Sequence, residues 1–442
     1  MSAKSIDQLR SVIGHNLCNR CGSCVGLSAG SIVFGDKTAS YLPEIVREPD
    51  TLLADSIWEA CPGKNFDFQL YRRKYYPQDT PFHVYTGPYK KIFIGYSRQE
   101  DIRRAAASGG VLSSILIWLL EKKLIDGAVV TGMSEAEPWL CKSFIATTPD
   151  QVLSASQSKY IITSVNEILP DIEAFKGKLA YVGLPGQIQS IRKLQAINHP
   201  SVQNIKYILG PFYGNTLHFS SIESFLRSYG EKNYRKIKKL YFRYGEWPGN
   251  MRIEMENERV IELPKFHANY LIPFHILKNS LLCTDLSNEF TDISGGDAWA
   301  PVYEERGKGF SMVIARSAQG LEILEALQKE GRMQLDEIGL QEAIDMHSHG
   351  YDLKKRGSFI RIRFRELLGL PVPDFGYKLK GFPLSRYLME IVILSLFLIL
   401  GSRPARFISE MVPPSLIGKL FENARISWKK STHNIKRNNL GE

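Results

Sequence analysis

The chain has few cysteines and no long uninterrupted apolar run, and both scarcities limit what it can be. Six cysteines in 442 residues make a poor disulfide framework, and half of them fall within seven residues. The N-terminal segment MSAKSIDQLRSVIGHN has charged and polar residues where a secretory signal needs an apolar core. We therefore expect a cytoplasmic protein in a reducing compartment.

The sequence also lacks a recognised nucleic-acid-binding motif, although its net charge is +10. Such a charge suits nucleic acid or another anionic surface. The nearest mixture of basic and aromatic residues is YRRKYYP, from Tyr71 to Pro77, and we interpret it as a solvated basic turn. The sequence therefore predicts no nucleic-acid partner.

The longest apolar stretch, YLMEIVILSLFLILG from Tyr387 to Gly401, is too short for an ordinary membrane span. Only about ten residues after Glu390 are uninterrupted, whereas a span needs about 20. A basic tail follows from Arg403 onward. Three interpretations remain open: a helix packed on the core, a helix lying peripherally on an anionic membrane surface, and, against its length, a true span.

Strand-like and helix-like segments alternate through the middle of the chain. The strand-like segments are KIFIGYS, DGAVVTGM, KLAYVGLPG and NIKYILGPF, and apolar helical patterns separate them. This order predicts an α/β (or α+β) fold with a mixed or parallel sheet. Further on, MRIEMENERVIEL predicts a β-hairpin.

Three regions follow from this pattern. Residues 1–75 are expected to form a small cysteine-bearing unit, with a hairpin around Gly35-Asp36 and a helix over TLLADSIWEA. Residues 90–330 are expected to form an α/β domain, reached through a linker at about 71–90. Residues 331–442 are expected to form a helical C-terminal region.

The cysteine spacing is the strongest chemical signal. Cys18, Cys21 and Cys24 stand at three-residue steps, and Cys61-Pro62 follows at a distance. A tight loop reaches three irons of a 4Fe–4S cluster, and the fourth thiolate comes from elsewhere in the chain. Gly22 lets this loop fold closely. A structural zinc site, which more often has two separated cysteine pairs or a Cys/His mixture, is the alternative.

Two further stretches suit a phosphate or nucleotide. Ser108, Gly109 and Gly110 open a helix, where free N–H groups attract a pyrophosphate, although the same residues also make an ordinary cap. Gly183, Pro185, Gly186 and Gln187 lie where a strand gives way to a helix, a usual ligand position in α/β sheets.

Two smaller groups complete the candidate cofactor-binding residues. Lys159 and Tyr160 supply a cation and a ring, or else form a solvated pair. Asp292, Gly296 and Asp297 form a loop of small and acidic residues, or else a plain turn. No catalytic residue is singled out. His218, His267 and His275 lie in the right half of the chain, and structural roles are the simpler interpretation.

Several of these stretches together resemble the coenzyme F420 hydrogenase/dehydrogenase beta-subunit family. The stretches are the cysteine loop, AAASGGVLSSIL, QSKYI, GKLAYVGLPGQIQSIRKL and CTDLSNEFTDISGGDAW. They cover residues 15–320 in family order. The resemblance implies FAD beside an iron–sulfur cluster, with reduced coenzyme F420 or ferredoxin as electron partner and with a partner subunit. It thus implies that residues 1–75 form an iron–sulfur cluster-binding unit and residues 90–330 an FAD-binding, catalytic α/β domain.

The chain departs from the family pattern at two cysteine positions. It has Gly186 in the turn and Ser280 where the later block often opens with cysteine. Cys141 and Cys283 are too few to ligate a second four-iron centre, so we expect one cluster and two buried, inert thiols.

The predicted function is therefore an iron–sulfur flavoprotein oxidoreductase. Three alternatives stay open. They are a ferredoxin-dependent pigment or small-molecule reductase, an accessory protein of cell-surface polysaccharide assembly that is redox-active or a scaffold, and a zinc-stabilised nucleic-acid-binding protein.

Overall fold

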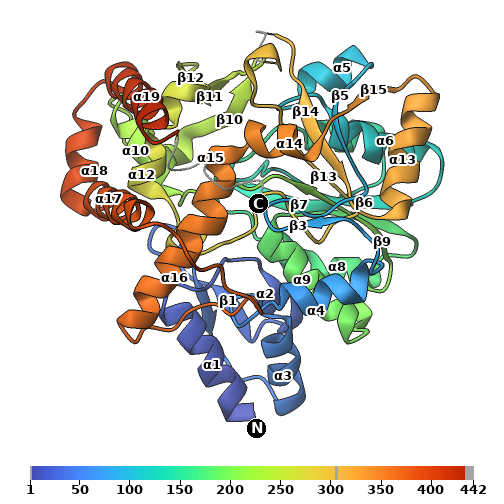
Figure 1. The fold of residues 1–442 in the computed structure, drawn as a ribbon. Coiled ribbons are helices and arrows are strands. Elements are labelled where there is room, and N and C mark those ends of the chain that lie inside the picture. The colour runs from blue at the N-terminus through green and yellow to red at the C-terminus, as the bar shows by residue number, and fades with distance from the viewer. Residues whose placement is uncertain (1, 304–306, 434–442) are drawn as a thin grey trace.

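A central sheet of eight strands organises the computed structural model, which describes residues 2–303 and 307–433 (Figure 1). Across the sheet the order is β15 (Met333–Glu337), β5 (Lys91–Ser97), β14 (Ser311–Ala315), β13 (Ile293–Asp297), β9 (Ile205–Pro211), β8 (Leu179–Val182), β6 (Gly127–Met133) and β7 (Cys141–Ala146). The predicted mixed sheet is confirmed. The domain division stays a prediction, and β15, from beyond residue 330, is an edge strand of this sheet.

Strand directions bring several loops to one edge of the sheet. Strands β13, β9, β8 and β6 run parallel, whereas β14 and β7 run antiparallel to their neighbours. Strand β5 is antiparallel to β14 and so points the same way as the parallel group. The carboxyl ends of five strands therefore meet at one edge, where α/β sheets bind ligands.

Alternating side chains build a core on each face of the sheet. Val129, Tyr181 and Ile208 pack on one face with α8 (Leu169–Ala174) and α9 (Pro185–Ala196). Their neighbours Val130 and Ala180 pack on the other face with α6 (Val111–Glu121) and α13 (Ala318–Lys329). The period of two along a strand produces this division, so both faces are buried.

The N-terminal unit lies below the sheet in Figure 1. It contains α1 (Ser2–Gly14), α2 (Ser23–Leu27), β1 (Ile32–Phe34), β2 (Pro43–Ile45) and α3 (Thr51–Ala60). Strands β1 and β2 pair as the predicted hairpin, and α3 matches the predicted helix. The interpretation of Tyr71 onward as a turn was wrong: α4 (Phe68–Tyr75) covers it, capped by the Asp67 side chain. Strands β3 (Phe82–His83) and β4 (Gly87–Pro88) follow.

A second, three-stranded sheet has its own core. It comprises β10 (Ile237–Tyr244), β11 (Asn250–Met255) and β12 (Val260–Pro264), the last two forming the predicted hairpin. Helices α10 (Ser220–Arg227), α11 (Lys265–Ala268) and α12 (Leu271–His275) accompany it. The shorter elements are α5 (Glu100–Ala105), α7 (Pro149–Ser154), η1 (Val165–Ile168), η2 (Pro200–Val202), η3 (Tyr234–Lys236), η4 (Lys278–Leu281) and η5 (Pro301–Tyr303).

The C-terminal region is helical, as predicted. It contains α14 (Leu340–Met346), α15 (Ser348–Tyr351), the π-helix η6 (Asp352–Gly357), α16 (Ser358–Leu367), α17 (Leu384–Leu400), α18 (Arg403–Glu410) and α19 (Pro414–Ser431). Within the described residues no single helix has the length and apolar character to cross a membrane. Helices α17 and α18 meet those criteria only when taken together, and the chain bends by 69° between them.

A buried ionic network anchors α17 to the rest of the protein. Glu390 accepts hydrogen bonds from Arg361 Nε at 2.5 Å and from Arg386 Nη1 at 2.7 Å. Arg386 Nε also donates to Asp352 Oδ1 at 2.9 Å. All four side chains are at most 2% exposed. Removing one partner from such a network leaves charges buried without compensation.

We therefore expect Glu390→Ala to lower the free energy of unfolding by about 3–5 kcal/mol, because it leaves two buried guanidinium groups short of a carboxylate. The matched control is Glu100→Ala, whose i,i+4 partner Arg104 is 76% exposed. That control is expected to cost about 0.5 kcal/mol or less. Urea unfolding of both variants is the measurement, and equal losses would contradict the anchoring role.

Candidate functional site

The four cysteines of the N-terminal motif line one cavity. Cys18, Cys21, Cys24 and Cys61 surround about 360 Å³ of space together with Pro62 and Gly63. The first three come from the loop before and the start of α2, and Cys61 follows α3 directly. None of them forms a disulfide. The structure thus brings together the predicted metal ligands, and their binding role stays a prediction.

Hydrogen-bond donors point at these sulfur atoms. Arg20 N–H donates to Cys18 Sγ at 3.4 Å, and the backbone N–H groups of Gly63 and Lys64 hydrogen-bond to the Cys61 thiol. Burial raises the pKa of Cys18 to about 11 and that of Cys21 to about 12. Both are therefore thiols until a metal displaces their protons, and N–H donors of this kind stabilise and tune thiolate ligands.

A single metal ion and an iron–sulfur cluster need different spacings of the sulfur atoms that hold them. In the described part of the chain no three His, Cys, Asp or Glu side chains converge closely enough for one metal ion. Tetrahedral zinc with bonds of about 2.3 Å holds its sulfurs about 3.8 Å apart. A 4Fe–4S cluster carries its thiolates on four outer corners and needs a wider set. The four cysteines line one cavity, and backbone N–H groups are directed at the sulfur atoms of Cys18 and Cys61. This is the kind of donor set that such a cluster needs.

A buried hydrogen-bond network fixes the cysteine loop to the central sheet. Asn166 donates from Nδ2 to Ser23 Oγ at 2.8 Å, and its backbone N–H donates to Cys21 O at 2.9 Å. Ser23 Oγ also bonds Ser190 Oγ of α9 at 2.6 Å, and Tyr181 of β8 donates to Asn166 Oδ1. The loop is therefore held against strand β8 and helix α9.

Gly22 has a structural reason to be glycine in addition to the predicted one. Its φ is +94°, and a Cβ there would lie 2.6 Å from the backbone N of Glu167 and 2.8 Å from Ser164 O. The glycine allows a left-handed backbone and close approach to η1. The glycine thus lets the loop pack on the protein, and it also lines the cysteine cavity. Its predicted contact with a cluster stays a prediction.

A cation lies beside the fourth cysteine. Lys193 Nζ, from α9, donates to Cys61 O at 2.9 Å and to Asn65 O at 3.1 Å. Burial lowers the pKa of Lys193 to about 8. Its ammonium contributes positive potential close to a group of thiolates, which favours the reduced, more negative form of a bound cluster.

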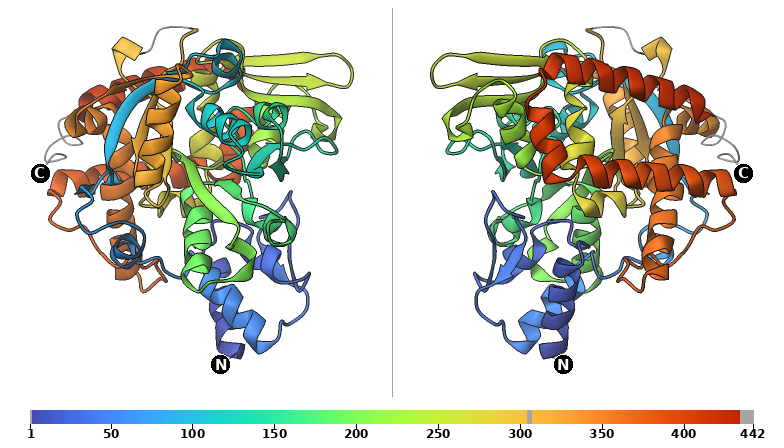
Figure 2. Two further views of the ribbon diagram at one scale, coloured as in Figure 1. Left: turned by 90° about the vertical axis from the view of Figure 1, so that its right-hand side faces the viewer. Right: turned by 90° about the vertical axis from the view of Figure 1, so that its left-hand side faces the viewer.

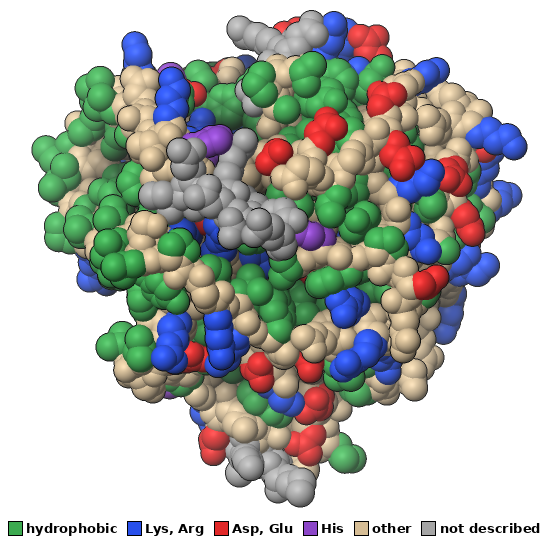
Figure 3. Space-filling view, in the orientation of Figure 1, with side chains coloured by type: hydrophobic (Ala, Val, Ile, Leu, Met, Phe, Trp, Pro, Cys, Tyr) green, Lys and Arg blue, Asp and Glu red, His purple; other side chains and the backbone are tan. Residues whose placement is uncertain are grey.

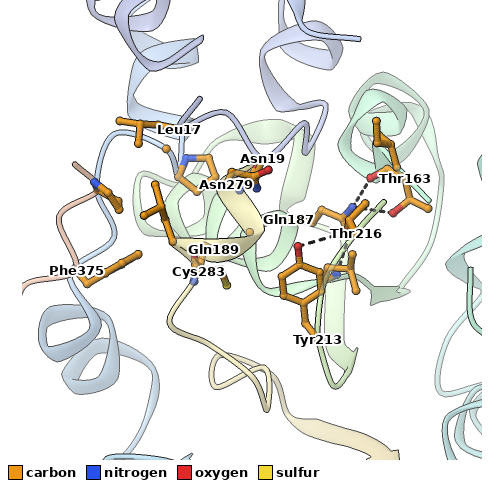
Figure 4. Close-up of a pocket in the computed structure, with 17 residues that line it drawn as sticks. Leu17, Asn19, Thr163, Gln187, Gln189, Tyr213, Thr216, Asn279, Cys283 and Phe375 are labelled. Carbon is orange, nitrogen blue, oxygen red and sulfur yellow. Dashed lines mark hydrogen bonds between the residues drawn. The ribbon is translucent and has the colours of Figure 1, made fainter. Parts of the chain in front are cut away.

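A larger pocket adjoins the cysteine cavity (Figure 4). It is partly open to solvent and spans about 740 Å³, including that open space, and it shares Asn19, Pro62 and Gly63 with the cysteine cavity. Amide, hydroxyl and aromatic side chains line it: Asn19, Thr163, Gln187, Gln189, Tyr213, Thr216, Asn279 and Phe375. Asn279 Oδ1 is buried without a hydrogen-bond partner. Such an acceptor needs a donor from a ligand or from water.

The predicted strand-to-helix turn forms one wall of this pocket. Gly186 and Gln187 line it, and Pro185 is the first residue of α9. Gln187 caps that helix, accepting from Leu184 N at 2.7 Å and donating to Thr163 O at 2.5 Å. A side chain at Gly186 would overlap Asn19, so glycine here lets the cysteine loop approach α9. Gly183, by contrast, packs on the Tyr181 ring.

A second group of predicted residues gathers around Arg243 of β10. Its guanidinium donates to the Tyr160 hydroxyl at 3.0 Å and to Asp297 Oδ1 at 3.2 Å, and Trp247 Nε1 also donates to Asp297 at 3.0 Å. Burial alone would raise the pKa values of Tyr160 and Asp297. The positive charges of Arg243 and Lys265 outweigh this effect and lower both pKa values. Sequence reasoning missed Arg243, because a lone arginine in a strand carries no motif.

The Ser-Gly-Gly motif meets the same edge of the sheet. Gly110 precedes α6 with φ +75°, and Ser108 Oγ bonds Ser311 Oγ at 2.6 Å. Gly109 N–H donates to Ser311 Oγ at 3.0 Å, and a Cβ there would press on Gly95 O. These contacts show close packing on β5 and β14, so part of the motif is explained without a ligand.

Three predicted residues have other partners. Lys159 Nζ donates to the carbonyls of Ala155, Ser156 and Gln157, at 2.5–3.1 Å, and burial lowers its pKa to about 8. Gly296 approaches the Phe212 ring. Asp292 precedes β13, at the opposite edge from Asp297, and accepts from Ile208 N and the Ser317 hydroxyl. Asp292 is therefore not brought to the candidate site.

Residues that sequence reasoning missed come from distant segments. Tyr213 and Thr216 follow β9, Asn279 lies in η4, and Phe375 lies in the C-terminal region. Cys283 also lines the pocket and is half-buried, so the expectation that it is buried was wrong, while its inertness stays a prediction. Cys141, in β7, is half-buried too. Asn19 could have been predicted as a site residue from one feature of the sequence, its position inside the cysteine motif.

Two of the three histidines considered from sequence are poor proton donors. His218 and His275 both hydrogen-bond through Nδ1 to Ser220 Oγ, at 3.1 and 2.9 Å. Burial lowers the pKa of His218 to about 4 and that of His275 well below its usual value. Both are neutral at pH 7. His267 instead faces Glu422 at 3.2 Å.

We expect Cys61→Ser, purified without oxygen, to lose most of its iron, because one corner of the cluster then lacks a thiolate. Cys141→Ser is the matched control, and it should retain about four irons per chain. Iron and acid-labile sulfide are measured together. Full iron content in Cys61→Ser would contradict the proposed ligand set.

Acid should destabilise the protein through its buried histidines. Burial lowers the pKa of His347 to about 4, and this ring lies between Phe212 and Tyr351. The unfolded imidazole takes up a proton near pH 6.5 and the folded one only near pH 4, so stability falls as the pH drops through this window.

For one such histidine the expected loss between pH 7 and pH 5 is about 2 kcal/mol. In His347→Phe the free energy of unfolding should therefore differ less between pH 7 and pH 5, by a similar amount. This holds whatever the variant's stability at pH 7. Urea unfolding at both pH values measures it. An unchanged difference would show that His347 is not buried in its neutral form.

The comparisons with known proteins cover more than half of the chain. Residues 92–170 match the family model for the N-terminal part of the coenzyme F420 hydrogenase/dehydrogenase beta subunit. Residues 176–340 match the model for the C-terminal part of the same beta subunit. The two matches meet at α8 and together contain most of the sheet. The cysteine loop and helices α15–α19 lie outside them.

Curated relatives are similar at low identity. The coenzyme F420-dependent sulfite reductase of Methanocaldococcus jannaschii is 25% identical over 346 residues, covering 75% of this chain and 49% of that protein. The chain thus spans about half of that relative's length. The coenzyme F420 hydrogenase subunit beta of Methanococcus voltae is 25% identical over 302 residues, covering 65% of this chain and 99% of the relative.

A solved structure shares the fold. A chain of the F420-reducing NiFe hydrogenase complex from Methanosarcina barkeri superimposes with a TM-score of 0.52 at 21% identity, covering 66% of this chain and 97% of that one. The sheet, the two matched regions and the relatives agree on one assignment. The chain belongs to the coenzyme F420 hydrogenase/dehydrogenase beta-subunit family.

Proposed function

We propose that this chain is an iron–sulfur flavoprotein oxidoreductase subunit. It would pass electrons between reduced coenzyme F420 or ferredoxin and a partner or small-molecule substrate, through FAD and one 4Fe–4S cluster. The observation that carries the proposal is that the cysteine cavity and the larger pocket share Asn19, Pro62 and Gly63 as a wall. Two redox groups bound there would be neighbours.

Cys18, Cys21, Cys24 and Cys61 would hold the cluster, which supplies one-electron transfer. Their cavity is largely apolar, and Leu9 and Val12 of α1 help to close it. Exclusion of water strengthens the effect of Lys193 and of the N–H donors on the thiolates. A second cluster has too few ligands nearby: Cys283 is the one thiol of the pocket wall, and Ser280 Oγ is bonded to the Tyr213 hydroxyl at 2.6 Å.

FAD would occupy the pocket and extend along the sheet edge. The flavin exchanges a hydride or two electrons with one partner and single electrons with another. Gly186, Gln187 and Asn279 border the pocket, and Tyr160, Ser108 and Asp297 lie farther along the same edge. Ile162 and Thr163, two and three residues after Tyr160, line the pocket, so one chain segment connects the two groups. An elongated dinucleotide suits such an extended site.

The chain's own residues orient and insulate this site. Arg243 holds Tyr160 and Asp297 in fixed positions, and Gln187 fixes the start of α9. Phe375 and Pro373 bring the C-terminal region over the pocket. The hydroxyl of Tyr213 faces the same pocket, where burial raises its pKa to about 12. It is therefore a neutral donor or acceptor at pH 7.

A partner protein is part of the proposal. The Methanococcus voltae relative is a hydrogenase subunit, and the structural neighbour comes from a hydrogenase complex. The pigment-reductase and polysaccharide-assembly alternatives stay predictions, since neither the fold nor the named relatives distinguishes them.

Single-turnover reduction tests the function. Protein purified without oxygen is mixed with reduced coenzyme F420 or, separately, with reduced ferredoxin, and flavin and cluster absorption are followed. We expect one donor to bleach the flavin and then the cluster. In Cys61→Ser the flavin should still bleach while delivery to a one-electron acceptor is lost; Cys141→Ser should behave as wild type. Failure of both donors, or absence of flavin and iron, would contradict the proposal.

A further inference from the structure

The C-terminal helices expose an unusual amount of apolar surface. Among the described residues, more than half of the exposed large hydrophobic side chains lie between Leu384 and Ile426. Figure 3 shows hydrophobic side chains gathered along the left edge of the molecule, over α17 and α18. Single exposed hydrophobic residues are ordinary, but a contiguous group marks an interaction surface.

Helix α17 turns an apolar face outward along its whole length. Its exposed hydrophobic residues are Leu384, Leu388, Ile391, Val392, Leu396, Leu398 and Ile399, with exposures between 48% and 73%. Steps of three and four residues put most of them on one side of the helix. Its polar anchors, Arg386 and Glu390, are buried on the other side. The helix is thus amphipathic, but its charged side chains face the protein and its hydrophobic side chains face outward.

Helices α18 and α19 extend this face. Figure 2 shows α17, α18 and α19 lying across one side of the molecule. Phe407, Ile408 and Met411 at α18 are 61–72% exposed, and Leu416 and Leu420 on α19 are 51% and 59% exposed. We call the exposed hydrophobic residues of these three helices the apolar plateau.

Charge is distributed unequally around the apolar plateau. All three carboxylates of these helices face the body of the protein: Glu390 is in the buried network, Glu410 accepts from Arg227 Nε at 2.9 Å, and Glu422 faces His267 at 3.2 Å. Arg403, Lys419 and Lys430 are exposed. The outer side therefore combines hydrocarbon with positive charge and carries no outward carboxylate in the described helices.

This combination matches the interface of an anionic bilayer. Amphipathic helices lie in that interface with hydrocarbon in the acyl boundary and basic residues among the headgroups. The buried anchor and the 69° bend hold α17 and α18 across the protein surface. A second copy of the chain fits less well, because two faces rimmed by positive charge would repel each other, and the net charge of the chain is +10.

We propose that the apolar plateau docks this protein on an anionic lipid surface, with α17 and α18 lying in the interface plane. The proposal is independent of the redox function, because vesicle binding is measured without electron transfer.

Flotation with vesicles tests the docking. The full-length protein is mixed with phosphatidylcholine vesicles with and without phosphatidylglycerol. We expect flotation with the anionic vesicles, weakened by salt. Leu388→Glu with Val392→Glu should reduce the bound fraction about tenfold, since two outward apolar side chains become anionic. The control is Leu52→Glu with Val260→Glu, at exposed positions elsewhere, which should float as wild type.

A second variant separates charge from hydrocarbon. Arg403→Gln with Lys419→Gln should lower binding to anionic vesicles by about tenfold and leave any binding to neutral vesicles unchanged. Wild type that does not float, or floats equally with and without Leu388→Glu and Val392→Glu, would overturn the proposal. So would a concentration-dependent dimer that those two substitutions dissolve, because the plateau would then be covered by a second copy.

Discussion

The contact between the cysteine loop and helix α9 is the constraint on which the rest of the site depends. Asn166, Ser23 and Ser190 join the two through buried hydrogen bonds, and Lys193 ties α9 to Cys61 O. Because α9 also begins at the wall of the larger pocket, the same contact sets where the thiols stand relative to that pocket. Loss of any one of these bonds would leave a buried polar group unpaired, so the arrangement is rigid.

Local chemistry made part of this site predictable. The cysteine steps and Cys61-Pro62 pointed to four ligands in one place, and Gly186-Gln187 followed from a strand-to-helix change. Residues whose role depends on distant partners were not predictable. Arg243 reaches Tyr160 and Asp297 from another sheet, and Asn279 reaches the pocket from η4. Asp292 and Asp297 are close in sequence and were grouped for that reason, yet β13 carries them to opposite edges.

The fold shows the same division between local and distant information. Short strand-like runs separated by apolar helical patterns revealed β5, β6, β8 and β9 with their intervening helices, because each pattern is contained in a few residues. The strand order was not readable, since β14 and β15 insert beside β5 through pairings far apart in sequence. The outward apolar face of α17 was hidden for a related reason: an apolar run does not tell which of its sides the protein covers.

The central claim is that four thiols hold a 4Fe–4S cluster against α9, beside a flavin pocket. Electron paramagnetic resonance of oxygen-free, dithionite-reduced protein tests it most directly. The account predicts the spectrum of a reduced 4Fe–4S centre integrating to about one spin per chain, and its loss when Cys24 is replaced by serine. A protein that contains zinc and gives no such spectrum would contradict the account.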